Sequence, residues 1–437
     1  MGESANIPPD RSWRVFACLM SLVILAAVAG QTALRPGIFM GDTINSRLAT
    51  VYALVHDHTW RIDRPPELPP NPFEPGTVDK VVVNGRLLSS KPPLIPLLMA
   101  GEYAALRAVF GWDLDNPAHL KPLAAVLIFT FCQLPFAVGL AFIAATARMF
   151  LPSWRRALPP LALLAFATPL WGYSGQFNNH TPAAAALMVC LYFALGMLTG
   201  RHAPKGWRFL LFGVSGGLVF AWDMPASAFV AAAGLCLLRR FPLPAFLWGG
   251  LGFFIPLSVH FGAMMWATGD PRPVQMREDL YVFESSYWRH PLGIDALNEP
   301  RGVYLFHMTL GRFGLFSLFP VLLLGVAGLF RPRCPDEPRA GMLAGAAAAA
   351  FLLLTAYYAA GTNNYGGASY GFRWYICAVP VLMLAALPVF ARLRGRAAWA
   401  LVLLLAAVSL YSSWECLQAP WGDSHEWTCR LIFGPAV

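Results

Sequence analysis

Apolar runs of about 17 to 25 residues recur along the whole chain, and each is long enough to cross a bilayer as an α-helix. Of the 437 residues, 57% are hydrophobic and only 13% are charged. A soluble protein of this length carries roughly twice that charged fraction. The sequence therefore predicts an all-α, polytopic transmembrane helix bundle that forms one domain over residues 1–437.

The apolar runs predict about 11 membrane spans. Arg11 and Arg14 precede the first span, so the positive-inside rule predicts a cytoplasmic amino terminus and, after an odd number of crossings, an external carboxy terminus. The stretch Arg11–Ala29 also resembles a secretory signal, but its apolar region continues to Ala33 and favours a retained helix. The expected spans are Trp13–Thr32, Leu120–Met149, Leu158–Gly175, Thr181–Leu198, Phe209–Asp223, Ala226–Leu238, Pro244–Thr268, Gly314–Phe330, Met342–Ala360, Trp374–Phe390 and Ala397–Trp414.

Basic residues gather in short connections between alternate spans, which the positive-inside rule assigns to the cytoplasmic face. The net charge of +9 is therefore a topology signal. Because no basic stripe alternates with aromatic residues, nucleic-acid binding is not expected. The clusters are Arg148, Arg155 and Arg156; Arg201, Lys205 and Arg208; Arg239 and Arg240; Arg331, Arg333 and Arg339; and Arg392, Arg394 and Arg396.

The long polar connections fall almost entirely on the outer face, at residues 33–93, 176–180, 269–313 and 361–373 and in the carboxy-terminal tail. This asymmetry favours chemistry at the outer surface over a route through the membrane midplane. In the first loop, apolar residues at helical spacing predict an amphipathic helix, and Asn84-Gly85 predicts a hairpin with a type I′ turn. Pro92 and Pro93 then open an expected interfacial or re-entrant helix that reaches about Phe110. The apolar positions of the amphipathic helix are Ile44, Leu48, Val51, Tyr52 and Val55.

Asp42 and Lys91 are the first candidate site residues. Asp42 follows the first span and suits a general base that takes a proton from an acceptor hydroxyl; an equally good interpretation is a helix N-cap. Lys91 precedes a helix start, where a cation is unfavourable unless an anion such as phosphate joins both. The alternative for Lys91 is an interfacial lysine that reaches the lipid headgroups.

Arg373 repeats the position of Lys91, because it lies on the outer face at the start of a span and follows a Gly-rich loop. Its planar guanidinium can bind two phosphate oxygens, although ordinary lipid headgroups would also satisfy it. Four further residues are candidate cavity contacts, with helix capping as the alternative at the turn around residue 180. They are Asn179, His180, Asp223 and Tyr370.

The second large outer loop mixes charged and aromatic side chains, which suits either a sugar-binding lip or an interfacial aromatic belt. No zinc-ligand spacing, Gly-rich phosphate loop or nucleophile elbow is present, so no cofactor is expected and metal dependence stays open. In the external tail, Cys416 and Cys429 are candidates for a disulfide or for two unpaired thiols. The loop residues are Arg272, Arg277, Glu278, Asp279, Tyr287, Trp288, Arg289, His290 and Arg312.

With these residues in place, the chain resembles the GT-C superfamily of membrane glycosyltransferases, in the branch of the lipid A aminoarabinose transferases and the protein O-mannosyltransferases. The motifs that carry the resemblance are Gly41-Asp42, Ser90-Lys91-Pro92-Pro93-Leu94 and Tyr370-Gly371-Phe372-Arg373. The chain departs from many relatives at Thr43, where they have a second acid, and at Asn178-Asn179-His180, where they have an acid at the outer turn.

The resemblance implies an inverting transferase in a bacterial inner membrane, with its active site facing the periplasm. Its donor would be a polyprenyl-phosphate-linked sugar and its acceptor a lipid, glycan or protein hydroxyl. By resemblance, Asp42 would be the base, and Lys91, with Arg373 as a looser match, would bind the donor phosphate. The alternatives are a flippase or transporter for a polyprenyl-linked or anionic lipid, which needs the cations but no base, and a non-catalytic partner in an envelope complex.

Overall fold

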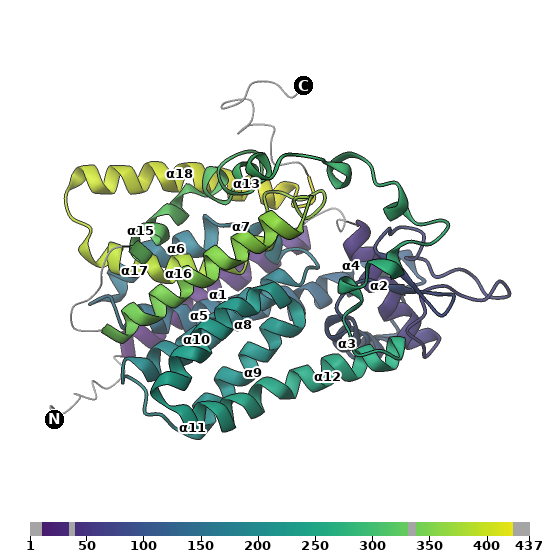
Figure 1. Cartoon of the computed structure of the whole chain (residues 1–437), viewed down its shortest axis with the longest axis horizontal. Coiled ribbons are helices and arrows are strands. Elements are labelled where there is room, and N and C mark those ends of the chain that lie inside the picture. The colour runs from purple at the N-terminus through teal and green to yellow at the C-terminus, as the bar shows by residue number, and fades with distance from the viewer. Residues whose placement is uncertain (1–10, 35–39, 331–337, 423–437) are drawn as a thin grey trace.

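The computed structural model describes residues 11–34, 40–330 and 338–422. It is about 72% helical, which confirms the all-α class. Figure 1 shows most of the long helices running roughly side by side, with α2, α3 and α4 gathered at one end of the bundle, on the right. These three helices form a separate group at one end of the bundle.

Six helices in the described ranges are long and apolar enough to cross a membrane. The segment α8 is the central one, because 89% of its apolar window is buried, against 22% for α1. Shorter apolar helices accompany them, so the total of about 11 crossings stays a prediction. The six are α1 (Arg11–Leu34), α4 to α5 (Pro117–Ala147), α8 (His180–Leu198), α11 to α12 (Pro242–Thr268), most of α16 (Pro338–Gly361) and α18 (Arg396–Gln418).

Two segments expected as continuous spans are broken at prolines. The first divides before Pro169, and the second is interrupted by a 3-10 turn that begins at Pro320. Proline lacks the amide hydrogen that would continue the helix, and it biases the preceding residue away from helical geometry. The pieces are α6 (Trp154–Phe166) and α7 (Pro169–Ser174), then α14 (Leu315–Leu318), the turn Pro320–Leu322 and α15 (Leu323–Phe330).

The other membrane-region elements follow the expected pattern, with shifted ends. Asp223 lies between two helices that are joined by a 3-10 turn. A 3-10 turn also precedes the last but one helix and contains Arg373. The elements are α9 (Gly206–Trp222), the turn Met224–Ala226, α10 (Ser227–Arg240), the turn Arg373–Tyr375 and α17 (Ala378–Arg392). A π-helical turn at Phe129–Gln133 joins α4 (Pro117–Ile128) to α5 (Leu134–Ala147). A second π-helical turn, at Ala245–Gly249, joins α11 (Pro242–Pro244) to α12 (Gly250–Thr268).

The first outer loop contains the two helices that the sequence predicts. The amphipathic helix is α2 (Asp42–His56), and the helix after the two prolines is α3 (Leu94–Phe110). The apolar face of α2 is buried in a cluster of its own, shared with α3 and α4. The cluster includes Ile44, Leu48, Val51 and Tyr52 from α2, Ile95, Met99 and Tyr103 from α3, and Leu123 and Leu127 from α4.

The expected hairpin is present as β1 (Lys80–Val83) and β2 (Arg86–Ser89), paired antiparallel with Lys80 opposite Ser89. Asn84 and Gly85 have φ of 51° and 73°, the two positive values that a type I′ turn requires. The apolar face of the hairpin packs against the carboxy-terminal end of α12 through a small cluster that includes Val81, Leu88 and Met264.

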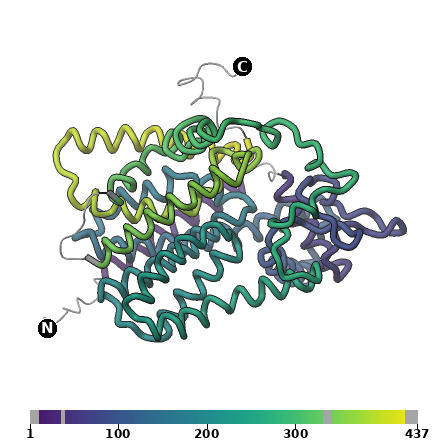
Figure 2. Tube along the Cα trace, in the orientation of Figure 1, coloured from purple at the N-terminus to yellow at the C-terminus, as the bar shows by residue number. Residues whose placement is uncertain are grey.

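The second outer loop begins as a chain of short 3-10 turns and ends in a helix. Figure 2 traces this segment, in green, past the first outer loop, in purple. Trp288 joins the two loops, since its indole N–H donates to the carbonyl of Val78 at 3.0 Å. The elements are the turns Val274–Met276, Glu278–Tyr281, Tyr287–Arg289 and Gly293–Ala296, followed by α13 (Arg301–Thr309).

Cys416 is buried, and Cys429 lies outside the described residues, as do Arg331 and Arg333. The expected choice between a disulfide and two thiols at Cys416 and Cys429 therefore stays a prediction.

Candidate functional site

The base of the hairpin holds an ion pair between Asp79 and Lys91. Asp79 directly precedes β1 and Lys91 follows β2 by two residues, so the register of the strands brings them together. The ladder extends one step beyond the strands, because the Ser90 amide donates to the Asp79 carbonyl at 3.0 Å. The Lys91 ammonium lies 2.6 Å from the Asp79 carboxylate. Lys91 was predicted as a site residue, whereas its partner Asp79 was missed.

Helix α2 fixes Asp79 from the other side. The Thr43 hydroxyl donates to the Asp79 carboxylate at 3.1 Å, and the Ser46 hydroxyl donates to the Asp79 carbonyl at 2.7 Å. Ser46 also lies 2.6 Å from the Ser89 hydroxyl, so the helix contacts both strands at the base of the hairpin. These contacts make Asp79 a rigid carboxylate with only 14% of its side chain exposed.

Asp42 is the first residue of α2, and its side chain is exposed beside the ion pair. Gly41, not Asp42, occupies the N-cap position, so the capping interpretation is wrong for this side chain. One Asp42 carboxylate oxygen instead accepts from the Val78 amide at 2.7 Å. Asp42 is thus tied to the residue before Asp79, and its second carboxylate oxygen stays available for a ligand.

Arg47 is a buried cation that the sequence analysis missed. Its side chain is 1% exposed; it donates to the Thr43 carbonyl at 2.9 Å and to the Asn179 side-chain oxygen at 2.7 Å. Its Nε is buried without a hydrogen-bond partner among the described residues. Burial lowers the pKa of Arg47 to about 10, and Arg373 adds to this effect by repulsion while Asp79 opposes it. A signal was present, because Arg47 lies on the apolar face of α2 with Ile44 and Leu48.

Arg373 interacts electrostatically with the same carboxylate, Asp79. Its guanidinium lies over the Trp421 ring, 5.3 Å from the centroid. Within the described ranges it has no carboxylate within 4 Å, and its buried Nε has no hydrogen-bond partner. Gly366 permits this position, because a Cβ there would lie 3.1 Å from the Arg373 Cγ and φ is 89°. An unpaired guanidinium in a partly buried place favours an anionic ligand.

Three cations therefore interact electrostatically with one largely buried carboxylate, and Lys91 is the one in direct contact with it. Burial lowers the pKa of Lys91. Attraction by Asp79 acts to raise this pKa, and repulsion by Arg47 and Arg373 offsets part of that increase. Burial alone would raise the pKa of Asp79, but attraction by Lys91 and Arg373 and the hydrogen bonds from Lys91 and Thr43 hold that pKa below its usual value. Asp79 is thus ionised at neutral pH, and the positive charge around it exceeds what it neutralises.

Asp295 adds a carboxylate from the second outer loop, and the sequence analysis missed it too. It accepts a hydrogen bond from the Tyr287 hydroxyl at 3.2 Å. Burial raises the pKa of Asp295, repulsion by Asp79 and Asp42 adds to this, and Tyr287 and Arg373 oppose it. The loop residues Tyr287 and Trp288, predicted as part of a lip, therefore lie against the first loop.

The predicted cavity contacts divide into two groups. Asn179 belongs to the site through Arg47, and its amide N–H also donates to the Trp222 carbonyl at 2.8 Å. His180 and Asp223 are buried behind it and pair with each other at 2.8 Å. Tyr370 is buried in the bundle core beside Phe319, with ring centroids 6.5 Å apart. Asn179 occupies the N-cap position of α8 without a capping hydrogen bond from its side chain, and the side-chain oxygen of the preceding Asn178 accepts from the Thr181 amide at 2.7 Å.

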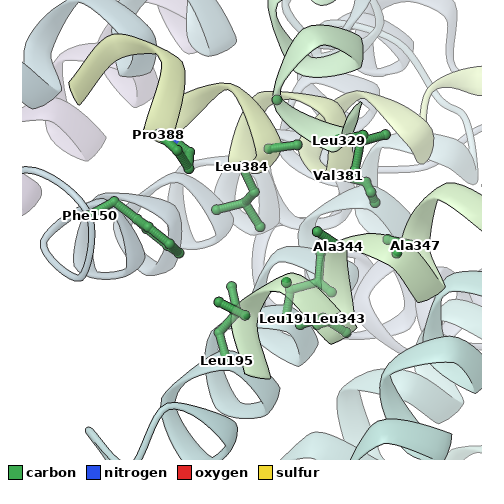
Figure 3. A pocket seen from close by; sticks show the side chains of 15 residues that line it. Phe150, Leu191, Leu195, Leu329, Leu343, Ala344, Ala347, Val381, Leu384 and Pro388 are labelled. Atoms are coloured by element: carbon green, nitrogen blue, oxygen red, sulfur yellow. The ribbon is translucent and has the colours of Figure 1, made fainter. Parts of the chain in front are cut away.

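Among the described residues, one small hollow lies beside the polar site and a larger one lies within the helix bundle. A hollow of about 20 Å³ beside Lys91, lined also by Ser89 and Thr268, holds no more than about one water molecule. A larger one of about 140 Å³ lies between α8, α15, α16 and α17 (Figure 3). Its lining is apolar and includes Leu191 and Leu384, so it offers no acid or base. A sugar phosphate at the polar site therefore requires the outer loops to separate.

Side chains suited to one metal ion gather at the other end of α2. In the described part of the chain, His56, Asp113 and Asp115 each offer a ligand atom, and these atoms lie within 4.8 Å of one another. They are separate from Asp42, which begins the same helix.

No protein-family model matches the sequence, and no curated protein matches it. The resemblance to the GT-C superfamily stays a hypothesis. Function is therefore argued from the geometry of the polar site.

Proposed function

We propose that the protein transfers a sugar from a lipid-linked phosphate donor to a hydroxyl acceptor at the outer face of a bacterial inner membrane. The observation that carries the proposal is the crowding of Arg47, Lys91 and Arg373 around Asp79, where Arg373 has no anionic partner among the described residues. Crowded cations that share one carboxylate gain stability from a further anion. A polyprenyl phosphate supplies that anion together with a tail that remains in the membrane.

In the proposed complex, the donor phosphate lies against Arg373 and Lys91. The guanidinium binds two phosphate oxygens, and the ammonium contributes a point charge. Both charges are most useful when the bond to the sugar breaks, because the departing phosphate then gains negative charge. One such group typically contributes about 10²–10³ in rate.

Asp42 is the proposed base. Its carboxylate takes the proton from the acceptor hydroxyl, and the hydroxyl oxygen forms the new bond to the anomeric carbon. The bond from that carbon to the phosphate oxygen breaks on the opposite face, its electron pair stays with the phosphate, and configuration inverts. The exposure of Asp42 favours an acceptor that arrives from outside.

The conservative variant Asp42→Asn tests the assignment. It should bind a polyprenyl phosphate as the wild type does, and its transfer rate should fall by about 10²–10⁴. The matched control is Asp279→Asn, which changes an exposed carboxylate of the second outer loop. Full activity of Asp42→Asn would remove Asp42 from the mechanism.

A flippase for an anionic lipid is the second candidate, because crowded cations with an unpaired guanidinium suffice to hold a lipid phosphate. The same variant separates the two. A flippase should move a labelled polyprenyl phosphate across vesicle membranes at the same rate with Asp42→Asn as with the wild type. A transferase should lose about 10²–10⁴ in its rate of sugar transfer with this variant.

A further inference from the structure

His56, Asp113 and Asp115 form a compact group at the outer edge of the first loop. His56 is the last residue of α2, and the two acids lie in the connection from α3 to α4. The histidine side chain is only 9% exposed, while Asp115 is 56% exposed. The group therefore has a buried nitrogen on one side and solvent on the other.

Tyr103 determines which nitrogen of His56 carries the proton when the ring is neutral. The Tyr103 hydroxyl donates its only proton to Asp113 at 3.2 Å, and it also lies 2.8 Å from the His56 Nε2. With the Tyr103 proton directed to Asp113, Nε2 is the donor in that second contact, and Nδ1 is left with a lone pair. Nδ1 makes no hydrogen bond to any described residue.

That lone pair faces another one. The His56 Nδ1 lies 4.0 Å from a carboxylate oxygen of Asp115. This distance is too long for a hydrogen bond, and neither atom carries a proton that could form one. Two acceptors that face each other at this distance repel unless a positive charge lies between them. Metal–ligand bonds of about 2.0–2.2 Å span such a gap.

We propose that His56, Asp113 and Asp115 bind a divalent transition metal ion of the Zn²⁺ class. One imidazole and two carboxylates suit such an ion better than Ca²⁺ or Mg²⁺, which prefer oxygen alone. Water completes the coordination on the exposed side of Asp115. The proposal is independent of the proposed glycosyl transfer.

The surroundings orient the ligands. The Tyr52 hydroxyl donates to Asp115 at 3.1 Å, and the Arg107 Nε donates to Asp113 at 2.9 Å. Hydrogen bonds from neighbouring side chains to the ligands are usual in metal sites. His56 is the last residue of α2, and Asp113 follows the end of α3 by three residues, so both lie near helix carboxy termini, whose partial negative charge favours a cation.

The ion has a structural role in this arrangement. Asp42 and His56 begin and end a helix of 15 residues, so about 21 Å separates the two ends at 1.5 Å per residue. A metal at His56 is thus too far away to touch a substrate at Asp42. It would instead fasten the end of α2 to the connection between α3 and α4.

The test is metal binding by the full-length, tag-free protein in detergent. After chelation and dialysis, the wild type should take up one Zn²⁺ per chain, and its melting temperature should rise on addition of the ion. The Co²⁺ form should show visible absorption that changes when the histidine is removed. Asp115→Asn should weaken Zn²⁺ binding by at least about 100-fold. Loss of a residue that only hydrogen-bonds to a metal ligand typically costs about 10–100-fold in affinity, and Asp115 is proposed as a ligand itself.

His56→Gln tests the nitrogen ligand directly, and His290→Ala is the matched control, since it removes an exposed histidine of the second outer loop. The control should bind zinc as the wild type does. Asp115→Asn remains informative if His56→Gln fails to fold, because Asp115 is more than half exposed. Absence of binding to the wild type, or zinc that persists unchanged in Asp115→Asn, would overturn the proposal and leave an adventitious ion only.

Discussion

Asp79 and Lys91 leave the hairpin at opposite sides of its base and meet at 2.6 Å. The pair is an internal substitute for an anionic ligand, because the Lys91 ammonium already has a carboxylate partner when the site is empty of substrate. A phosphate that binds here shares Lys91 with Asp79 and takes Arg373 for itself. The affinity for phosphate therefore depends on how strongly Asp79 competes with it for Lys91.

Asp79→Asn should lower stability and raise the response to phosphate. Removing one partner of a fully buried pair costs about 3–5 kcal/mol, and the partial exposure of both side chains reduces this to about 2 kcal/mol. Inorganic phosphate should then raise the melting temperature of the variant more than that of the wild type. Thermal unfolding in detergent measures both effects, and equal phosphate responses would contradict the crowding argument.

Arg373→Ala should weaken binding of a polyprenyl phosphate by roughly 30-fold or more, since truncating one partner of a buried charge contact costs about 2 kcal/mol or more. Arg373→Lys should recover part of the affinity, because it keeps the charge but loses the planar fork. Titration of the lipid into protein in nanodiscs gives the constants. Arg289→Ala, at an exposed arginine of the second outer loop, should bind normally, and a loss there as large as in Arg373→Ala would show a general charge effect.

Asn179→Ala should lower the free energy of unfolding by about 1.5–3 kcal/mol. It removes the side-chain oxygen that accepts from Arg47, and hydrogen bonds to charged groups contribute about that much. Asn179→Asp keeps an acceptor at that place and should be the milder change in thermal unfolding. A larger loss in Asn179→Asp than in Asn179→Ala would mean that repulsion between the new carboxylate and the Trp222 carbonyl outweighs the retained acceptor for Arg47.

Anion binding should depend on pH at both ends of the range. As the pH falls through the raised pKa of Asp295, that carboxyl loses its charge and repels a phosphate less, so affinity should increase. As the pH rises through the lowered pKa of Lys91, the ammonium loses its proton and affinity should decrease earlier than for an ordinary lysine. Binding of a phosphodiester lipid, whose own charge is constant, measures this. Asp295→Asn should abolish the acid-side increase only.

Trp288→Phe should loosen the contact between the two outer loops. The ring is retained, but the hydrogen bond from the indole to the Val78 carbonyl is lost. Hydrogen exchange of the amides near residues 78–83 should become faster, while exchange in α8 should not change. Unaltered exchange at the hairpin would show that Trp288 does not hold the loops together.

Local sequence patterns predicted those elements of the fold that depend on local chemistry. The apolar stripe from Ile44 to Val55 predicted α2, the two prolines before Leu94 predicted the start of α3, and Asn84-Gly85 predicted the turn. Continuous apolar composition could not show the breaks before Pro169 and at Pro320, because hydropathy averages over proline.

The candidate site could be predicted only in part, since its contacts join distant segments. Lys91 and Arg373 were found from their positions at helix starts, but nothing local indicates that they share Asp79. Asp79 resembles an ordinary loop acid before a strand, and its importance comes from pairing across the hairpin. Arg47 is the exception, because a charged residue on the buried stripe of an amphipathic helix is a signal that can be read from sequence.

The hairpin also offers a practical handle. Both charged partners lie at the base of the strands, while Asn84 and Gly85 lie at the other end, in a tip whose residues are exposed. A fluorescent label or a short epitope placed at this tip would project away from the ionic contacts and leave their register untouched. Distance changes reported from there would reveal whether the outer loops separate when a lipid arrives.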